Sequence, residues 1–489
     1  MRASSFLSKS LFMRGRQCLK SLYLHKYHPD LRDEITPAQE AIFQTGHTVG
    51  RYAQNLFPGG VEIPYEGLSI TQQLRQTAYA IQAGGRTLYE AAFQFNGVFV
   101  KVDILHRGEQ GWELYEVKAS GELKPEHVDD VAIQCYVVAG AGLPLTKASL
   151  VYINKEYVRR GDIDVAELFV VEDLTGTVSE IQDLIPDRIN QMREMLRGEM
   201  PSIDIGPQCS DPYDCDFRGQ CWKDIPEESI FSIRGRLPNR FELYREGIVQ
   251  LQDIPRDILS ASQLIQVEGT LEKKNVINRE GLREFLSTLW FPLCFLDFET
   301  TYMMPIPLFD ETRPYQQVPF QYSLHLSERE NGELLHYEFL ADPGTDPRRD
   351  LLESLLERIP DNACILCYNM AFEKGRLSDC KTWFPEHAEK IDTFIENIQD
   401  LMVPFRKKDV YQWQMNGSYS IKNVLPALIP EMSYEGMAIN SGDMASSAWF
   451  AMAEMNDPEE REKKRRALLE YCKLDTLAMV KILEKLRTL

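Results

Sequence analysis

Two acidic residues interrupt an apolar run in "CFLDFET", residues 294–300, where Phe298 separates Asp297 from Glu299. Side chains alternate along a strand, so both carboxylates would share one face and Phe298 would lie on the other. Neighbouring anions repel each other unless a cation lies between them. The pair therefore predicts either a strand end with solvated carboxylates or a site for a divalent cation.

Residues further along the chain could complete such a cation site. Glu373 follows a predicted buried strand in "ILCYNMAFEKGRL", and "LLEYCKLDTLAMVKIL" places Tyr471 and Asp475 four residues apart on one face of a predicted helix. In this order, D-x-E, a middle acid and Y-x-x-x-D resemble the DnaQ-type exonucleases (DEDD tyrosine subtype), which have an RNase H-like fold. Glu373 stands where that family usually has Asp, and Asp400 in "IQDLMVPF" is the alternative.

This resemblance implies two-metal hydrolysis of phosphodiesters from 3′ ends. Two Mg²⁺ or Mn²⁺ ions about 4 Å apart would activate the attacking water and stabilise the leaving oxygen. Tyr471 would orient that water, and the implied metal ligands are Asp297, Glu299, Glu373 and Asp475. Residues 406–428 mix basic and aromatic side chains, which can follow a phosphate backbone and stack on bases. A plain loop leading into a helix is the alternative for that segment.

A second set of residues lies in "TLYEAAFQFNGVFVKVDILHRGEQGWELYEVKAS", residues 87–120, which predicts three short strands. Glu90 falls on the first strand, Asp103 on the second, and Glu116 and Lys118 share a face of the third. Carboxylates at adjacent strand ends can hold a hard divalent cation, and a nearby Lys can position water and offset phosphate charge. A surface hairpin with a Glu–Lys pair is the alternative.

These residues resemble the motif of the RecB-like PD-(D/E)XK nucleases. The family's motif is matched by Asp103, Glu116, Lys118, a Gln on a following helix at Gln134 and an upstream helical His at His47. The resemblance implies that His47, Asp103 and Glu116 bind metal and that Lys118, Gln134 and Glu90 assist catalysis. Members of this branch usually have Tyr four residues after the Gln, where this sequence has Val138.

The ten cysteines are unevenly spaced. Cys18 precedes the nuclease-like motif, and C-x5-C-x5-C follows it at Cys209, Cys215 and Cys221. Four thiolates from opposite ends of a domain could clamp its termini around an inorganic centre. This arrangement resembles the iron–sulfur RecB-like nucleases, which implies a [4Fe–4S] cluster; tetrahedral zinc is the alternative. A further CxxC, Cys364 and Cys367, lies in the apolar "ACILCYN" and predicts two core residues.

The chain's 489 residues are too many for one ordinary domain. Alternating helix and strand patterns predict an α/β protein with three parts. Residues 1–225 would form a PD-(D/E)XK, restriction-endonuclease-like domain and residues 285–489 an RNase H-like domain. Residues 226–284, with "RGRLPNRFELYREGIVQLQDIP" as the clearest element, predict a small helical connector.

The amino-acid composition limits which cellular locations and which binding partners can be expected for this protein. A net charge of −20 argues against a general polyanion binder, so local basic stretches at 14–20, 406–408 or 463–466 would have to guide a nucleic acid. The first 29 residues contain no acid, but they lack the uninterrupted apolar core of a signal peptide. No apolar run approaches membrane-spanning length. We therefore expect a cytoplasmic protein with no membrane partner.

The two motifs together predict a two-headed DNA nuclease in DNA repair, recombination or defence, acting on single-stranded DNA or DNA ends. The C-terminal site would remove nucleotides from 3′ ends, and the N-terminal site would cut single-stranded DNA. One alternative is RNA processing by the C-terminal site. Another is an N-terminal half that binds DNA without cutting it.

Overall fold

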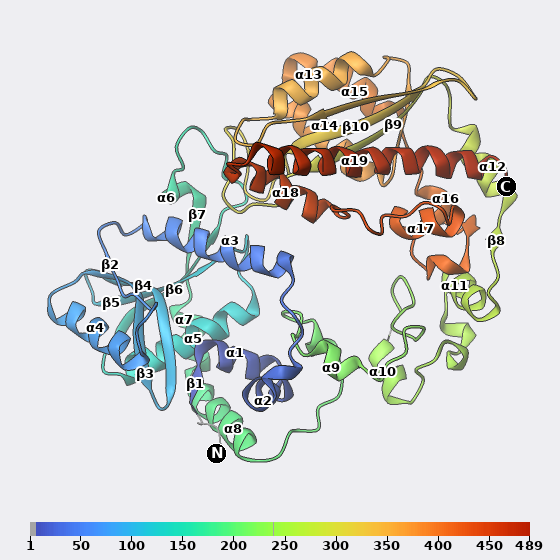
Figure 1. Ribbon diagram of the computed structural model, residues 1–489. Helices are drawn as coiled ribbons and strands as arrows, with labels where there is room; N and C mark the ends of the chain where they lie inside the picture. Colours follow the sequence, from blue (N-terminus) through green and yellow to red (C-terminus); the bar gives the residue numbers. More distant parts are fainter. Residues whose placement is uncertain (1–5, 238) are drawn as a thin grey trace. The chain divides into compact units, whose positions relative to one another are not determined.

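The computed structural model describes residues 6–237 and 239–489, and the chain divides into two compact units (Figure 1). The N-terminal unit comprises Met1–Asp224 and Met304–Gln316, and the C-terminal unit comprises Ile225–Met303 and Gln317–Leu489. Each unit combines helices with its own main β-sheet, so the predicted α/β class is confirmed. Among the described residues, no helix has both the length and the apolar character needed to cross a membrane.

The N-terminal unit is built on one mixed sheet. Its strands are β1 (Leu7–Ser8), β2 (Val61–Glu62), β3 (Thr87–Phe95), β4 (Val98–Arg107), β5 (Trp112–Lys118), β6 (Leu145–Ile153) and β7 (Phe169–Asp173). Its helices are α1 (Lys9–Gln17), α2 (Leu19–Tyr27), α3 (Pro37–Gln54), α4 (Ile70–Gln82), α5 (Pro125–Gly140), α6 (Val165–Leu168), α7 (Thr175–Ile181), α8 (Ile185–Arg197) and α9 (Arg218–Trp222).

The order of this sheet in the described chain is β2-β3-β4-β5-β6-β7, and β1 pairs in parallel with β4. Strands β3, β4 and β5 are antiparallel and confirm the three strands predicted in residues 87–120. Asn96 and Gly97 join β3 to β4 with φ values of 44° and 60°, the left-handed pair that a tight hairpin favours. Helix α5 then returns the chain to β6, which pairs in parallel with β5.

Both faces of this sheet are covered. One apolar cluster includes Phe12 of α1, Val138 of α5 and Ile189 of α8, and a second cluster packs Val49 of α3 against Tyr115. Residues 304–316 dock on this unit although the strands on either side of them belong to the other one. Arg159 Nη1 donates to the carbonyls of residues 307 and 308 at 3.1 and 2.7 Å.

The C-terminal unit has a smaller main sheet and more helices. Its strands are β8 (Val276–Ile277), β9 (Leu293–Thr300), β10 (Pro319–Ser327), β11 (Leu334–Leu340), β12 (Cys364–Cys367), β13 (Ile398–Asp400) and β14 (Val410–Tyr411). Its helices are α10 (Arg240–Arg245), α11 (Ala261–Glu272), α12 (Arg279–Ser287), α13 (Arg348–Arg358), α14 (Met370–Trp383), α15 (Ala388–Asn397), α16 (Val403–Arg406), α17 (Ile421–Leu428), α18 (Gly442–Glu454) and α19 (Pro458–Leu486).

The main sheet of this unit has the order β11-β10-β9-β12-β13 in the described residues. Strands β11, β10 and β9 are antiparallel, whereas β9, β12 and β13 are parallel. Alternate β9 residues Cys294, Leu296 and Phe298 enter the apolar core, which leaves the opposite face of β9 for Asp297 and Glu299. Both cysteines of β12 are fully buried, as predicted for core residues.

Residues 225–284 cluster with the C-terminal unit and contain less helix than expected. The predicted helical stretch "RGRLPNRFELYREGIVQLQDIP" forms only α10 and a short 3₁₀ turn, Leu251–Asp253, and its Pro238 lies outside the described residues. Gly247 adopts φ 84° directly after α10, and the amide of Ile248 closes the helix end on the carbonyl of Leu243. A glycine in this conformation ends a helix at low steric cost.

Candidate active sites

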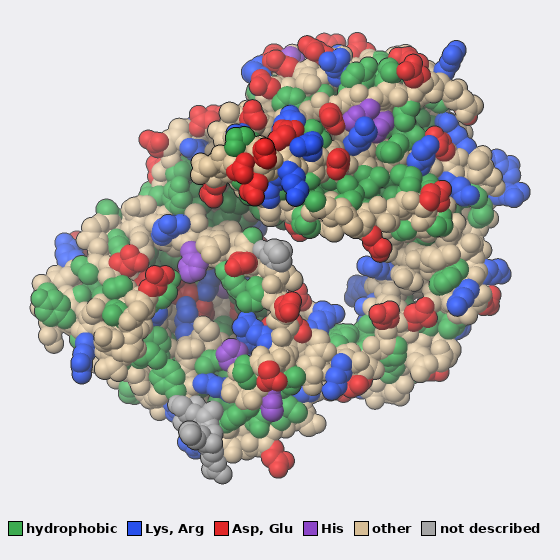
Figure 2. All heavy atoms as spheres, in the orientation of Figure 1, with side chains coloured by type: hydrophobic (Ala, Val, Ile, Leu, Met, Phe, Trp, Pro, Cys, Tyr) green, Lys and Arg blue, Asp and Glu red, His purple; other side chains and the backbone are tan. Residues whose placement is uncertain are grey.

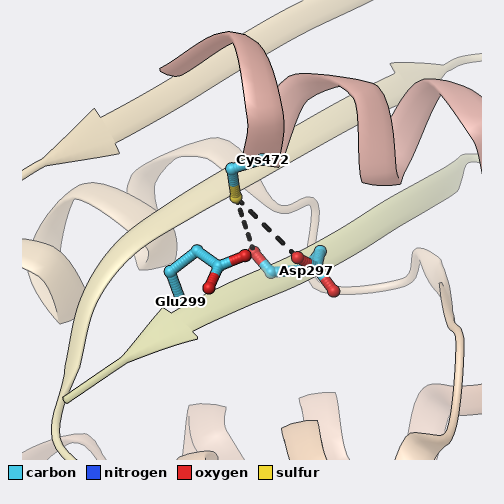
Figure 3. Close-up of side chains that lie close together, drawn as sticks. All are labelled: Asp297, Glu299 and Cys472. Carbon is cyan, nitrogen blue, oxygen red and sulfur yellow. Dashed lines mark hydrogen bonds between the residues drawn. The ribbon is translucent and has the colours of Figure 1, made fainter. Parts of the chain in front are cut away.

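In the C-terminal unit, acidic side chains gather where α19 crosses β9. Asp297 and Glu299 extend from one face of the strand toward Cys472 of α19, as the alternation along β9 predicts (Figure 3). One ligand atom from each of these three residues lies within 4.8 Å of the other two. The Sγ of Cys472 donates weakly to Asp297 Oδ2, 3.8 Å away. Two carboxylates and a thiol therefore converge on one point.

Helix α19 adds two more polar groups from the same region. Tyr471 and Asp475 are both buried, 4% and 7% exposed, and lie one helical turn apart as predicted. The hydroxyl of Tyr434 donates to Asp475 Oδ1 at 2.6 Å, and its ring packs edge-on against Tyr471. Lys422 Nζ lies 5.8 Å from the centroid of each of these two rings. The carboxyl of Asp475 is thus held by a neutral donor beside a single ammonium group.

Burial and mutual repulsion raise the pKa values of these carboxyls. Burial raises the pKa of Asp297 well above its usual value, and the charges of Asp475 and Glu299 raise it further. Burial and Asp475 also raise the pKa of Glu299, which Lys422 opposes. The pKa of Asp475 is raised to about 7, chiefly by burial. The group holds more negative charge than its surroundings neutralise, which is the condition that favours a bound cation.

Glu373 and Asp400, the two alternatives for the middle acid, have different environments. Glu373 lies in the first turn of α14, which follows a turn through Asn369 at φ 73°. Glu373 is 1% exposed, and its Oε2 has no hydrogen-bond partner among the residues that the structure describes. Burial and Asp400 raise the pKa of Glu373 to about 8. Asp400 Oδ1 accepts from the amides of Asn369 and Met402, each at 3.0 Å. Asp400 therefore holds the turn, and Glu373 has the free oxygen that a metal ligand needs.

In the N-terminal unit, β4, β5 and α5 bring four of the predicted residues together. Glu116 Oε1 accepts from Lys118 Nζ at 2.7 Å, and Glu116 Oε2 accepts from Gln134 Nε2 at 2.7 Å. Asp103 Oδ2 accepts from the amide of Val117 at 2.7 Å. Glu116 and Gln134 are 1% and 0% exposed. The motif residues thus form one hydrogen-bonded group at the ends of adjacent strands.

Two residues that the sequence did not predict complete this group. Lys9 Nζ of α1 donates to Glu116 Oε1 at 2.7 Å and lies 3.3 Å from Asp130 Oδ1. Asp130 Oδ2 accepts from Lys118 Nζ at 2.5 Å. Burial lowers the pKa of Lys118, but the neighbouring carboxylates outweigh it and place its pKa well above the usual value. Asp130 precedes Gln134 by one helical turn, a spacing that could have pointed to it; no local pattern points to Lys9.

Two predicted residues are not part of this group. His47 lies on α3 with an exposed side chain. Glu90 has a positive φ of 57° on β3 and forms an ion pair with Lys101 of β4, whose Nζ lies over the ring of Tyr65. Neither side chain hydrogen-bonds to Asp103 or Glu116 in the described chain. The structure therefore gives no support to the roles expected for His47 in metal binding and Glu90 in catalysis.

The four predicted thiols line one pocket of the N-terminal unit. Cys18 lies between α1 and α2, and the other three, from the segment before and within α9, are Cys209, Cys215 and Cys221. All four are half-buried and free. Arg14 of α1 binds Asp216 through two hydrogen bonds of 2.5 and 2.9 Å, which hold the α9 segment against the start of the chain. A ring of soft sulfur donors is the set that iron–sulfur clusters and zinc use.

The basic stretches expected to guide a nucleic acid are largely paired within the protein. Arg16 binds Asp129, and Lys408 is buried with its Nζ 4.5 Å from the ring centroid of Tyr411. On α19 the basic residues 463–466 are consecutive and follow the acids Glu459, Glu460 and Glu462, and Arg466 pairs with Glu462 at 3.6 Å. Figure 2 shows basic and acidic side chains intermingled on the visible face of this helix. Each of the three stretches therefore has at least one basic side chain already engaged within the protein.

One sequence-family model is similar to part of this chain. Residues 294–420 match a family described as a domain of unknown function, DUF2779. That range includes Asp297, Glu299 and Glu373, whereas Tyr471 and Asp475 lie beyond it. The match covers less than half of the chain.

One similar curated protein is the "Uncharacterized protein MG366 homolog" of Mycoplasma pneumoniae, 28% identical over 207 residues. The matched region is 38% of this chain and 31% of that protein, so this chain spans about a third of its relative's length. A solved structure described as "Crystal structure of SSO0001" is 12% identical and covers 42% of this chain and 81% of its own. Its TM-score of 0.22 is too low to relate the two folds.

Proposed function

We propose that the C-terminal unit is a metal-dependent 3′–5′ exonuclease acting on DNA. The observation that carries this proposal is the convergence of four acidic side chains from three separate elements, with raised pKa values and one buried oxygen without a partner, beside Tyr471. These carboxyls are Asp297 and Glu299 of β9, Glu373 of α14 and Asp475 of α19. Uncompensated buried acids of this kind mark functional sites more often than structural ones.

Each side chain has a role that follows from its position. The carboxylates would hold Mg²⁺ or Mn²⁺, hard cations that prefer oxygen ligands and that, when bound, supply an activated water and stabilise a leaving oxygen. Tyr471 keeps its proton, because burial and nearby acids raise its pKa, and so can donate a hydrogen bond to water. Lys422 offsets part of the acidic charge of Glu299 and Asp475.

The fold of the C-terminal unit supports this reading. Counted from the first strand of the main sheet, the order is 3-2-1-4-5, with three antiparallel strands followed by two parallel ones. An RNase H-like sheet is expected to have this arrangement, with the acids on its first strand and on a helix packed across it. The positions of Asp297 on β9 and Asp475 on α19 fit that expectation.

For the N-terminal unit we propose a RecB-like nuclease that cuts single-stranded DNA. The strand–strand–strand–helix–strand order of β3, β4, β5, α5 and β6 and the linked Asp103, Glu116, Lys118 and Gln134 support it. The four cysteines would hold a [4Fe–4S] cluster that fastens the two ends of the unit, with zinc as the alternative. Iron and sulfide content and visible absorption of anaerobically purified protein distinguish these centres. Both activities would suit a cytoplasmic protein that processes DNA ends in repair, recombination or defence.

A second function for the N-terminal unit is a DNA-binding module without catalysis. The observation that favours it is the full use of Glu116: its two oxygens already accept from Lys9, Lys118 and Gln134. A metal ion at Glu116 would therefore have to compete with three hydrogen-bond donors for the lone pairs of one carboxylate. DNA binding without cleavage in Mn²⁺ would favour this function.

The test uses anaerobically purified protein with Mg²⁺ or Mn²⁺ on single-stranded DNA labelled at either end. We expect Asp297→Ala to lower the rate of shortening from the 3′ end by about a thousandfold or more. We expect Lys118→Ala to remove a separate set of cuts. Glu357→Ala, an exposed acid on α13, is the matched control. Loss of only the first activity would leave the N-terminal unit as a DNA-binding module. Unchanged products in both variants would exclude the two-headed nuclease.

A matched RNA oligonucleotide in the same assay tests the remaining alternative. Faster digestion of RNA than DNA, abolished by Asp297→Ala, would make the C-terminal unit an RNA-processing exonuclease.

A further inference from the structure

The thiol of Cys472 sits among the carboxylates of the C-terminal site. Its Sγ lies 3.8 Å from Asp297 Oδ2 and 3.9 Å from the Asp297 carbonyl oxygen, and the residue is 0% exposed. Figure 3 shows the thiol of α19 directed at Asp297, with the Glu299 side chain beside it. A site built for Mg²⁺ alone needs only oxygen donors, so the proposed exonuclease chemistry leaves this sulfur unused.

Glu299, a proposed Mg²⁺ or Mn²⁺ ligand, lies in the same place. It is 5% exposed, and its carboxylate accepts no hydrogen bond from the residues that the structure describes. A buried, unpaired carboxylate is costly unless a cation or a proton compensates it. One of its oxygens is among the three ligand atoms that lie within 4.8 Å of one another. The free carboxylate and the thiol therefore point to the same ligand.

The separation of the donors matches a tetrahedral ion that takes both sulfur and oxygen. Zn–S bonds of about 2.3 Å and Zn–O bonds of about 2.1 Å give a tetrahedral S–O separation of about 3.6 Å. The observed separation of Cys472 Sγ from Asp297 Oδ2 is 3.8 Å. A small closing movement of the side chains would satisfy both bonds. Thiolate selects zinc and cadmium over magnesium, because Mg²⁺ is hard and binds sulfur weakly.

We propose that Asp297, Glu299 and Cys472 form a site for a thiophilic divalent cation of the zinc class. The ion would displace the thiol proton to solvent and bind the resulting thiolate together with two carboxylates. Asp297 and Glu299 cannot complete an oxygen-ligated Mg²⁺ or Mn²⁺ site while they hold this ion. Occupancy would thus arrest the C-terminal nuclease; this second consequence rests on the proposed function, whereas the binding site does not.

The first experiment measures binding without activity. Cd²⁺ is titrated into the purified full-length protein, and the ultraviolet charge-transfer absorption of new cadmium–thiolate bonds is followed with bound stoichiometry. Wild type is expected to bind one more Cd²⁺ than Cys472→Ser, with extra absorption. The affinity of the site is expected to fall at least about tenfold in the variant. The four-cysteine pocket of the N-terminal unit contributes equally to both proteins and cancels in the difference.

Two further variants control for folding and for cysteine number. Cys472→Ala serves as a second variant in case the serine hydroxyl disturbs the packing of α19. Cys380→Ala removes another buried thiol, in the apolar core of the same unit, and is expected to bind Cd²⁺ as wild type does. Equal stoichiometry, affinity and absorption in wild type and both Cys472 variants would overturn the proposal.

The second experiment separates this inference from the proposed function. Zn²⁺ is titrated into the Mg²⁺-supported 3′-end assay, and each variant is compared with its own zinc-free rate. Half-inhibition is expected at about tenfold or more higher Zn²⁺ in Cys472→Ser than in wild type or Cys380→Ala. No nuclease activity with an intact Cd²⁺ difference would refute the function and keep the site. Nuclease activity with the same zinc sensitivity in all three proteins would support the function and refute zinc binding through Cys472.

Discussion

The acidic groups of the two units balance their charge in different ways. The N-terminal group sets two ammonium groups against three carboxylates: Lys9 and Lys118 against Asp103, Glu116 and Asp130. The C-terminal group sets one ammonium and one guanidinium group, those of Lys422 and Arg376, against four carboxylates: Asp297, Glu299, Glu373 and Asp475. In the first group every carboxylate has a hydrogen-bond donor, while in the second Glu373 keeps a buried oxygen without one.

This difference separates a group that is complete by itself from one that needs an added ion. Buried carboxylates are stabilised only when donors or cations replace the water they lose. Lys9 and Lys118 do this within the N-terminal unit, so an entering metal ion meets the repulsion of two ammonium groups that already compensate the carboxylates. In the C-terminal unit the compensation has to come from protons or from bound cations. The C-terminal site should therefore respond strongly to metal and pH, and the N-terminal site weakly.

Among the tests of this comparison, the largest effect on nuclease activity should come from neutralising Glu373. This change tests whether the free oxygen of Glu373 acts as a metal ligand. Glu373→Gln keeps the size of the side chain but removes its charge, so we expect 3′-end shortening to fall about a hundredfold to a thousandfold. Thermal stability of the metal-free protein should be retained at neutral pH, where Glu373 with its pKa of about 8 is already largely protonated, and raised above that pKa, where the variant lacks a repelling buried charge. Steady-state digestion of labelled DNA and thermal denaturation of the same preparations measure the two outcomes.

Asp400→Asn is the matched comparison for Glu373→Gln. Asp400 Oδ1 accepts from the amides of Asn369 and Met402, and an Asn oxygen accepts the same two bonds without the charge that strengthens them, so the substitution should cost about 1 kcal/mol of stability. Activity per folded molecule should change little. The reverse pattern, with activity lost in Asp400→Asn and kept in Glu373→Gln, would make Asp400 the metal ligand and remove Glu373 from the comparison.

The next effect is a pH dependence that only the C-terminal group should produce. Folded protein keeps protons on Asp475 and Glu373 up to pKa values of about 7 and 8, whereas unfolded carboxyls release them near about pH 4. Between these values the unfolded chain binds fewer protons, so the free energy of unfolding falls as pH rises, by up to about 1.4 kcal/mol per pH unit for each proton. Burial lowers the pKa of Lys9, but Asp130 and Glu116 raise it above its usual value, so Lys9 stays charged throughout this window.

Thermal denaturation of metal-free protein from pH 5 to pH 8 measures this slope. Glu373→Gln should reduce it, and saturating Mn²⁺ should flatten it, because cations replace the retained protons. A Glu116→Gln variant should keep the wild-type slope. A slope that follows Glu116 rather than Glu373 would reverse the roles given to the two groups.

Local patterns in the sequence predicted the parts of each site that lie on one element. Alternation places Asp297 and Glu299 on one face of β9, and a four-residue spacing places Tyr471 and Asp475 on one face of α19. The strand pattern of residues 87–120 likewise predicts the three antiparallel strands, of which the second and third carry Asp103 and Glu116.

Residues that reach a site from another element were not predictable in this way. Lys9 meets Glu116 across 107 positions, and Tyr434 meets Asp475 across 41. Their partners are set by how helices pack on the sheets, which no short spacing encodes. The docking of residues 304–316 on the N-terminal unit has the same origin, since Tyr315 reaches the carbonyl of Ala119 across 196 positions. The balance of charge in each group therefore emerges only from the fold.

The smallest effect we predict tests whether Lys9 keeps metal out of the N-terminal group. Lys9→Met keeps an unbranched side chain but removes the ammonium group that contacts Glu116 and Asp130. Without that charge, Glu116 Oε1 keeps Lys118 as its donor and repulsion of a divalent cation falls, so Mn²⁺ should bind about tenfold more tightly. Calorimetric titration in an Asp297→Asn background, which weakens the C-terminal site, measures this affinity.

Lys155→Met is the control for Lys9→Met, because Lys155 forms an exposed pair with Glu122 at 3.3 Å and should not alter Mn²⁺ binding. Equal Mn²⁺ affinity in wild type and Lys9→Met would mean that Lys118 alone holds the carboxylates closed. Weaker binding in Lys9→Met would mean that Lys9 shapes the site rather than blocks it. In either case, removing the ammonium group of Lys9 would not be enough to open a metal site in the N-terminal group. The difference between the N-terminal and C-terminal groups would then lie in their geometry and not in their charge.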